Sequence, residues 1–119
     1  MKALLLVAHG SRRSASNDEI RELTKLLREK AGNNFDIVSC AFLELAEPSI
    51  PDGIEACIQK GATEVKVLPY FLSAGRHVAA DIPAEVKIKQ DEHPAINIRI
   101  TPYLGEASAV IDILLALSR

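Results

Sequence analysis

Several residue types and patterns are scarce in this sequence of 119 residues. It contains no tryptophan, one methionine and two cysteines, and aromatic residues make up only 4% of it. No apolar run approaches the roughly 18 residues of a membrane-spanning helix, which argues against an integral membrane protein. The formal net charge is -2, with lysine and arginine scattered among acids, so no basic surface for nucleic acid or an anionic membrane is expected. A small-molecule partner is favoured.

The two cysteines, Cys40 and Cys57, do not form a CxxC motif, and each lies within an apolar run. Such cysteines are typical of a hydrophobic core rather than of a disulfide or a thiol metal site. The apolar run at the N-terminus stops at His9 without a small-residue cleavage site, so we expect no signal peptide and a cytoplasmic protein.

The composition is that of a globular protein that can bury a hydrophobic core. Apolar residues make up 48% and charged residues 25%, far from the low hydrophobicity of disordered chains. The length suits one domain covering residues 1–119 and leaves no room for two ordinary domains.

Four apolar runs predict β-strands. The first is continuous and too short for a core helix, which is typical of a parallel strand covered on both faces. Between and after these runs, apolar residues recur at helical spacing. The strands are expected at residues 2–8, 35–42, 64–70 and 96–101, and the helices at residues 17–31, 50–60, 82–91 and 106–117.

Capping signals set the starts of these helices. Residues 16–19 have the Ser-x-x-Glu form of a capping box, which predicts that Ser16 caps the first helix. Ser49 precedes the second helix in the same way. Asp81 is expected to cap the third helix, so that residues 71–78 form a loop with a glycine at its centre.

Strands that alternate with helices indicate a parallel sheet, and right-handed crossovers leave few ways to wind it. The expected fold class is α/β, a single flavodoxin-like domain with a four-stranded parallel sheet of order 2-1-3-4 and helices on both faces. In that order the first and third strands are neighbours, and the chain leaves them toward opposite faces. A ligand crevice is therefore expected at their carboxyl ends.

Two histidines far apart in the sequence are expected at this crevice. His9 follows the first strand, and His77 closes the loop after the third. One histidine at such a place is usually an ordinary surface or core residue, but two at one crevice favour a functional pair. Neutral imidazole binds Fe(II), Co(II), Ni(II) and Zn(II), and its usual pKa of about 6.5 also suits proton transfer near neutrality. His93 precedes Pro94 in a charged turn, and no role is expected for it.

Two loops at the same crevice carry hydroxyls, cations and glycine. The first contains Ser11 and Arg12, and the second contains Ser73, Gly75 and Arg76. Loops of this kind near helix N-termini favour the carboxylates or phosphates of a ligand, with ordinary turn chemistry as the alternative. The sequence has no GxGxxG and no Walker motif, so no dinucleotide, ATP or other organic cofactor is expected.

An acidic loop follows the second strand on the crevice side of the sheet. Glu44 lies there between Leu43 and Leu45, a costly place for a carboxylate without a partner. We expect Glu44, in preference to Glu47, to complete a metal site or accept a proton. The open alternative is a solvated loop acid.

Four segments of the sequence form a set, in order and with fitting gaps. They are LLVAHGSR at residues 5–12, FLELAEPSI at 42–50, LPYFLSAGRHVAADIP at 68–83 and PYLG at 102–105. Together they resemble the CbiX family of sirohydrochlorin chelatases over nearly the whole chain. The HGSR piece alone is a weak signal, but the four pieces together are specific.

The resemblance implies a chelatase-like fold and a lyase that inserts Co(II), or alternatively Fe(II) or Ni(II), into sirohydrochlorin with loss of two pyrrole protons. Such a step belongs to cobalamin or siroheme-type biosynthesis and uses no ATP or organic cofactor. By the family pattern His9 and His77 bind the metal, and Glu44 matches the acid after the second strand, as ligand or base. The substrate carboxylates are expected to meet Ser11, Arg12, Ser73, Gly75 and Arg76.

Two other functions stay open. A histidine phosphatase also places a His-Gly pair after its first strand, but it needs an arginine directly before the histidine, where this chain has Ala8. A metal or tetrapyrrole carrier would use the same ligands as a chelatase, so that only turnover separates the two.

A homodimer with facing crevices is expected, because a tetrapyrrole is a broad plate and a four-stranded sheet offers only a shallow edge. The resemblance supports this, since longer relatives carry two such domains, often with a histidine-rich segment, and this chain matches the short form. The helix at residues 106–117 is apolar beyond one face, with mainly Ser108, Asp112 and Arg119 polar nearby. The alternative is that this helix packs deeply on its own sheet.

Overall fold

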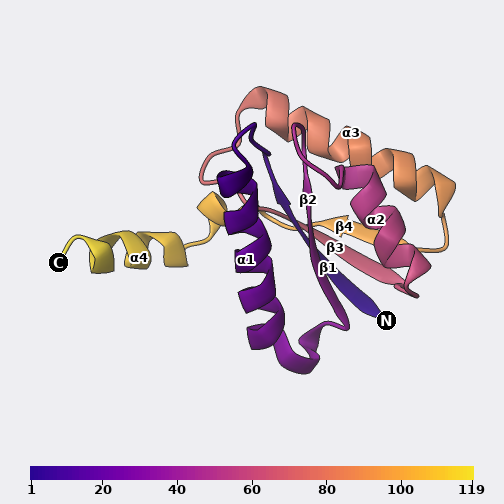
Figure 1. Ribbon diagram of the computed structural model, residues 1–119, viewed down its shortest axis with the longest axis horizontal. Coiled ribbons are helices and arrows are strands. Elements are labelled where there is room, and N and C mark those ends of the chain that lie inside the picture. Colours follow the sequence, from indigo (N-terminus) through magenta and orange to yellow (C-terminus); the bar gives the residue numbers. More distant parts are fainter.

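A four-stranded parallel sheet forms the centre of the molecule, with helices on both faces (Figure 1). The computed structural model describes residues 1–119, with the exception of the His77 side chain. The strand order is β2-β1-β3-β4, so the predicted α/β class and the order 2-1-3-4 are confirmed. The strands are β1 (Lys2–Ala8), β2 (Ile37–Phe42), β3 (Glu64–Pro69) and β4 (Asn97–Ile100).

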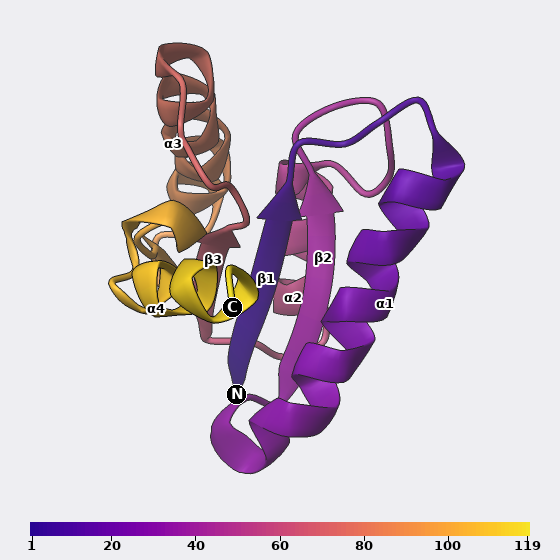
Figure 2. The ribbon, with the colours of Figure 1, turned by 90° about the vertical axis from the view of Figure 1, so that its left-hand side faces the viewer.

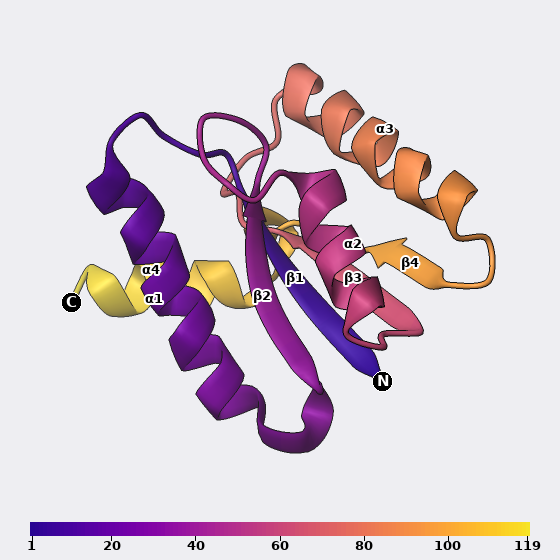
Figure 3. The same ribbon diagram turned by 45° about the vertical axis from the view of Figure 1, so that its right-hand side comes forward.

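The helices divide between the two faces of the sheet. Helix α1 packs on β2 on one face, whereas α2 and α3 cover the other, as Figures 1 and 3 show from two directions. The helices are α1 (Ser14–Ala31), α2 (Ile50–Gln59), α3 (Arg76–Glu92) and α4 (Ala109–Leu117), with short 3-10 turns η1 (Gly32–Asn34) and η2 (Leu104–Glu106).

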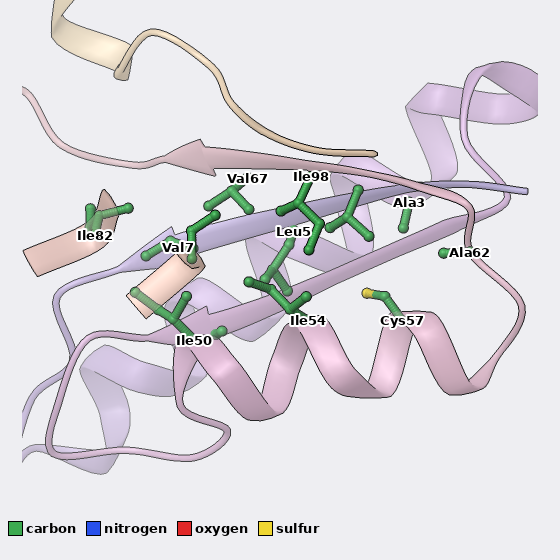
Figure 4. Close-up of a cluster of buried hydrophobic side chains, with 13 residues drawn as sticks. Ala3, Leu5, Val7, Ile50, Ile54, Cys57, Ala62, Val67, Ile82 and Ile98 are labelled. Atoms are coloured by element: carbon green, nitrogen blue, oxygen red, sulfur yellow. The ribbon is translucent and has the colours of Figure 1, made fainter. Parts of the chain in front are cut away.

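The hydrophobic core lies between the sheet and the layer of α2 and α3 (Figure 4). Alternate residues of β1 point into it, because successive side chains of a strand face opposite sides. Its largest fully buried members include Leu5, Ile50 and Ile54. Cys57 is buried in the same cluster, and burial raises the pKa of its thiol. Cys40 is partly buried and both cysteines are free, which confirms that they are not paired in a disulfide.

Helix α1 begins earlier than the sequence predicts. Its first residue is Ser14 and its N-cap position is Arg13, so the predicted capping role of Ser16 is wrong. The buried side chain of Asn17 bonds instead to the preceding loop: its Nδ2 donates to the Ser11 carbonyl, and its Oδ1 accepts from the Ser11 amide. These two hydrogen bonds hold the loop against the first turn of α1, which begins at Ser14.

Helix α3 also begins early, and here the difference affects the site. It starts at Arg76 with Gly75 at the N-cap, so the predicted loop over residues 71–78 and the predicted cap at Asp81 are wrong. His77 therefore belongs to the first turn of α3 instead of closing a loop.

The early start of α3 follows from its apolar spacing. Val78, Ile82 and Val86 recur every four residues, and all three pack on the core, so the first turn already carries part of the buried face. Pro83 lies inside this helix at an exposed position. The sequence suggested a boundary at Asp81 because aspartate is a favoured N-cap residue.

The last helix, α4, lies apart from the sheet. It begins at Ala109, three residues later than expected, because residues 104–106 form η2. It leaves the sheet on the side of α1 and points away from it (Figures 1 and 2). None of its residues is buried, so the alternative that it packs deeply on its own sheet is wrong. Within the described part of the chain, no helix is both long and apolar enough to cross a membrane.

Candidate functional site

The loops after β1 and β2 bring His9 and Glu44 together. The two loops continue the pairing of their strands, because the Leu43 amide donates to the Ala8 carbonyl at 2.9 Å and the Glu44 amide donates to the His9 carbonyl at 3.0 Å. His9 Nε2 then lies 3.6 Å from Glu44 Oε1. The structure thus brings an imidazole and a carboxylate close together at the carboxyl end of the sheet.

Gly10 makes this close approach possible. Its φ is +93°, a left-handed value that side chains disfavour, and a β-carbon there would meet the Glu44 carbonyl oxygen at 1.8 Å. Any other residue would push the two loops apart. The glycine is thus required by the packing of one loop on the other.

The Glu44 side chain is exposed, although the apolar residues on either side of it in the sequence suggested a buried environment. The side chains of His9 and Glu44 are 49% and 54% exposed. Leu45 is itself half exposed and has a φ of 64°, so the loop turns its leucine outward. The expectation that Glu44 occupies a costly apolar environment is wrong. The carboxylate is open to solvent, where an incoming ion can reach it.

The backbone of the other loop acid, Glu47, is held by Arg21. Its carbonyl accepts from Arg21 Nη2 at 3.1 Å, and its side chain is exposed. The Arg21 guanidinium lies over the Phe42 ring at 5.2 Å from the centroid. Arg21 therefore fixes the course of the loop after β2.

The loop after β1 forms a turn that exposes two cations, Arg12 and Arg13. The Ser11 hydroxyl accepts from the Arg13 amide at 3.1 Å, which leaves its own proton free to donate. Arg12 is exposed between them. The sequence does not point to the buried Asn17 that secures this turn, because a polar residue in a helix gives no sign of which loop it will bond.

The segment after β3 supplies the opposite edge of the site. The Tyr70 amide donates to the Val7 carbonyl at 2.7 Å, which confirms that β1 and β3 end side by side. Ser73, Gly75 and Arg76 are all exposed, with Gly75 and Arg76 at the start of α3. The side chain of His77 is outside the described part of the structure, so its predicted pairing with His9 stays a prediction.

An apolar cavity lies beside this segment, under the first turns of α3. Its volume is about 210 Å³, below the range of roughly 300–1,000 Å³ in which drug-sized ligands are enclosed. It is lined by residues of β3, α3, β4 and η2, among them Phe71, Val78, Ile82, Ile100 and Tyr103. A broad ligand would therefore have to rest on the open edge of the sheet.

The turn η2 is tightly packed against the segment after β3. The Gly105 amide donates to the Phe71 carbonyl at 2.9 Å. A β-carbon on Gly105 would meet the Leu72 carbonyl oxygen at 1.7 Å, so only glycine fits. The segment that leads into α3 and His77 is thus braced by the segment that leads into α4.

His93 takes part in a separate polar cluster at the other end of α3. His93 Nε2 lies 2.9 Å from Glu55 Oε1, and Lys89 Nζ contacts Glu55 at 3.0 Å and Glu92 at 2.7 Å. Glu55, Glu92 and His93 have the donor types of a metal site, but the Lys89 ammonium already lies among them. This cluster joins α2 to the end of α3, in agreement with the expectation of no role for His93 in the crevice.

A family model described as CbiX matches residues 3–119 of the chain. The chain belongs to the CbiX family. It is 42% identical over 110 residues to the chloroplastic sirohydrochlorin ferrochelatase of Arabidopsis thaliana, covering 92% of this chain and 48% of that protein. It is 38% identical over 93 residues to the sirohydrochlorin cobaltochelatase of Methanocaldococcus jannaschii, covering 78% and 64%.

Solved structures of CbiX relatives share the fold. A CbiX protein from Marinobacter aquaeolei VT8 has a TM-score of 0.84 and 27% identity, covering 99% of this chain and 94% of that one. The sirohydrochlorin chelatase SirB from Bacillus subtilis subspecies spizizenii, in complex with cobalt, has a TM-score of 0.84 and 30% identity, covering 97% and 48%. The chain spans about half the length of several of the relatives that it matches.

Proposed function

We propose that this CbiX-family chain is a sirohydrochlorin chelatase, which inserts a divalent metal ion into the tetrapyrrole as its two pyrrole protons leave. The observation that carries the proposal is the His9–Glu44 pair, held at 3.6 Å at the carboxyl end of the sheet and open to solvent. Family membership over residues 3–119 supports the choice of substrate.

The metal is a substrate in this proposal, and His9 is its first ligand. A neutral imidazole binds Co(II), Fe(II) and Ni(II), and a carboxylate at the distance of Glu44 adds charge that attracts a divalent ion. His77, in the first turn of α3 across the crevice, is proposed as the second ligand. No organic cofactor takes part in the proposed reaction.

Proton removal falls to the same groups. A metal can replace the two pyrrole protons only if nearby bases accept them. The carboxylate of Glu44 can accept one, and the imidazole of His9 can accept the other once its lone pair has released the metal to the ring. Both side chains are about half exposed, so water can carry the protons away. We assign Glu44 the role of proton acceptor or ligand beside His9.

The acidic side chains of the tetrapyrrole are proposed to meet the rim of the crevice. Arg12 and Arg76 supply the cations, and the Ser11 hydroxyl has its proton free to donate. Ser73 and the Gly75 amide lie at the N-terminal end of α3, where the helix dipole favours negative charge. These contacts would position the ring without changing during the reaction.

The proposed working unit is a homodimer whose crevices face each other. The cavity under α3 is about 210 Å³, and the remainder of the site is an open edge, so one copy offers the ring a single wall. A second copy related by twofold symmetry would supply the other wall.

The physiological metal can be identified by comparing the rates at which the protein inserts different metal ions. Relatives carry both ferrochelatase and cobaltochelatase names, and imidazole and carboxylate ligands do not by themselves select cobalt over iron or nickel. We favour Co(II) as the metal, in a cobalamin-type pathway. The test is to incubate the purified protein with sirohydrochlorin and each of Co(II), Fe(II) and Ni(II) and to follow the absorption change. Insertion above the rate in buffer supports a chelatase, whereas stoichiometric binding without turnover supports a carrier.

A further inference from the structure

A groove lies along the outer edge of β2, apart from the crevice at the carboxyl ends of β1 and β3. Strand β2 is an edge strand of the sheet, and it runs between α1 and α2 in Figure 3. The groove has a volume of about 330 Å³, within the range of roughly 300–1,000 Å³ that is typical of small-molecule sites. Its lining includes the buried Gly53 and Cys57 of α2, and none of the described residues assigned to the crevice. We call it the edge groove.

The edge groove concentrates positive charge, although the whole chain has a net charge of -2. Three cationic side chains line it, and none of its described lining residues is acidic. They are Arg21 and Arg28 of α1 and Lys60, which directly follows α2. A cleft lined by charges of one sign raises the local concentration of ions of the opposite sign. The edge groove therefore attracts anions.

Two of these three cations are not paired with an acid. The Lys60 ammonium makes no ion pair with any described side chain. Arg28 Nε and Nη2 donate to the Val38 carbonyl at 3.0 and 2.6 Å, which fixes the guanidinium without neutralising its charge. Only Arg21 has an acidic partner in the described structure, the Asp18 carboxylate at 2.9 Å. Arg28 and Lys60 are therefore the cations that are available to a ligand.

The backbone of Cys40 adds a hydrogen-bond donor to the edge groove. The Leu43 amide donates to the Ala8 carbonyl, and alternate residues of a parallel strand bond to the same neighbouring strand. Val38, Cys40 and Phe42 therefore direct their amides and carbonyls away from β1, toward the open edge of the sheet. Cys40 lines the edge groove, and its amide has no acceptor among the described residues.

The open part of the β2 edge is too short to pair with a peptide strand. On one side of Cys40, the Val38 carbonyl already accepts from Arg28. On the other side, the Phe42 amide already donates to the Pro48 carbonyl at 2.9 Å. An added strand needs successive unpaired groups along an edge, so the edge groove favours a compact ligand over a peptide.

We propose that the edge groove binds the carboxylate or phosphate group of a small molecule. Arg28 and Lys60 supply the positive charge, and the Cys40 amide supplies a directed hydrogen bond. Guanidinium and ammonium groups are common partners of both kinds of oxyanion, and a guanidinium that is already fixed loses little freedom when the ligand binds. The site is separate from the crevice, so this inference goes beyond the proposed chelatase function and does not depend on it.

An NMR titration tests the site without metal or tetrapyrrole. The isotope-labelled chain is titrated with inorganic phosphate and, separately, with malonate at constant ionic strength, and the signal of the Cys40 amide is followed. We expect this signal to shift and to saturate with at least one of the two anions, and the tighter of the two identifies the preferred oxyanion. Chloride is the salt control. A Cys40 signal that saturates with neither anion, or that moves equally with chloride, would overturn the proposal.

Variants of Lys60 separate binding in the edge groove from binding elsewhere. Lys60 is exposed, so its replacement should leave the fold intact. In the same titration, Lys60→Gln should raise the Kd of the tighter anion at least about fivefold, because it removes one charged contact. Lys60→Arg keeps the charge and should stay within about twofold of the native chain. Lys25→Gln removes an exposed cation of α1 outside the edge groove and should bind like the native chain. Equal Kd values for Lys60→Gln and Lys25→Gln would refute the proposed site.

Discussion

Gly10 approaches Glu44 so closely that a β-carbon at position 10 would lie 1.8 Å from the Glu44 carbonyl oxygen. This contact joins the loop that carries His9 to the loop that carries Glu44. The distance between the His9 imidazole and the Glu44 carboxylate therefore depends on the backbone contact between Gly10 and Glu44, as well as on the two side chains.

Gly10→Ala is expected to lower both stability and insertion rate. The left-handed φ alone costs about 1–2 kcal/mol for an alanine, and displacement of the Glu44 backbone adds to this. Gly61→Ala is the control, because Gly61 also has a positive φ, +107°, but an added β-carbon would meet only the flexible end of the Met1 side chain, at 3.0 Å. In urea denaturation, Gly10→Ala should lose clearly more stability than Gly61→Ala. Equal losses would show that the contact with Glu44 is unimportant.

The sheet order was predictable from the sequence because each strand is a short apolar run and parallel crossovers allow few orders. The position of His9 followed directly from that order. The start of α3 was not predictable in this way. Asp81 and Pro83 are residue types that often begin a helix, but here they lie inside a continuous one. The packing of Val78, Ile82 and Val86 on the core decides the true start, and that packing exists only in three dimensions.

Long-range backbone contacts were likewise hidden in the sequence. Asn17 secures the turn after β1, and Gly105 braces the segment after β3, but neither residue carries a motif that names its partner. The apolar character of α4 was visible in the sequence, whereas its separation from the sheet was not. The sequence pattern of an apolar helix is the same whether the helix covers its own sheet or a partner.

Arg76→Ala should raise the KM for sirohydrochlorin more than it lowers kcat. The carboxylates that Arg76 is proposed to bind do not change during insertion, so their contact stabilises bound substrate and transition state alike. Steady-state kinetics at saturating cobalt would measure both constants, with Lys25→Ala on the exposed side of α1 as the charge control. If KM is the same in Arg76→Ala and in the control, Arg76 does not bind the substrate.

Glu55→Gln should change how stability depends on acid pH. Hydrogen bonds from Gln59, His93 and Lys89 lower the pKa of Glu55 from 4.5 to about 2 in the folded chain. A lowered folded pKa adds stability that is present above 4.5 and is lost as pH falls toward about 2. The unfolding free energy of Glu55→Gln should therefore fall less steeply than that of the native chain between these pH values.

The control for this pH effect is Glu29→Gln, which replaces an exposed acid of α1. Its unfolding free energy should follow the pH dependence of the native chain. Identical acid slopes for Glu55→Gln and Glu29→Gln would refute the proposed contribution of the cluster between α2 and α3.

The initial rate of cobalt insertion into sirohydrochlorin tests the assignment of the site most directly, measured side by side for the native chain, His9→Ala and His93→Ala. His9 lies 3.6 Å from Glu44 in the crevice, whereas His93 contacts Glu55 at 2.9 Å at the far end of α3. We expect His9→Ala to lose at least about tenfold in rate, as the loss of a metal-binding group does, and His93→Ala to stay within about twofold of the native chain. A His9→Ala protein that inserts cobalt at the native rate would contradict the assignment of the site.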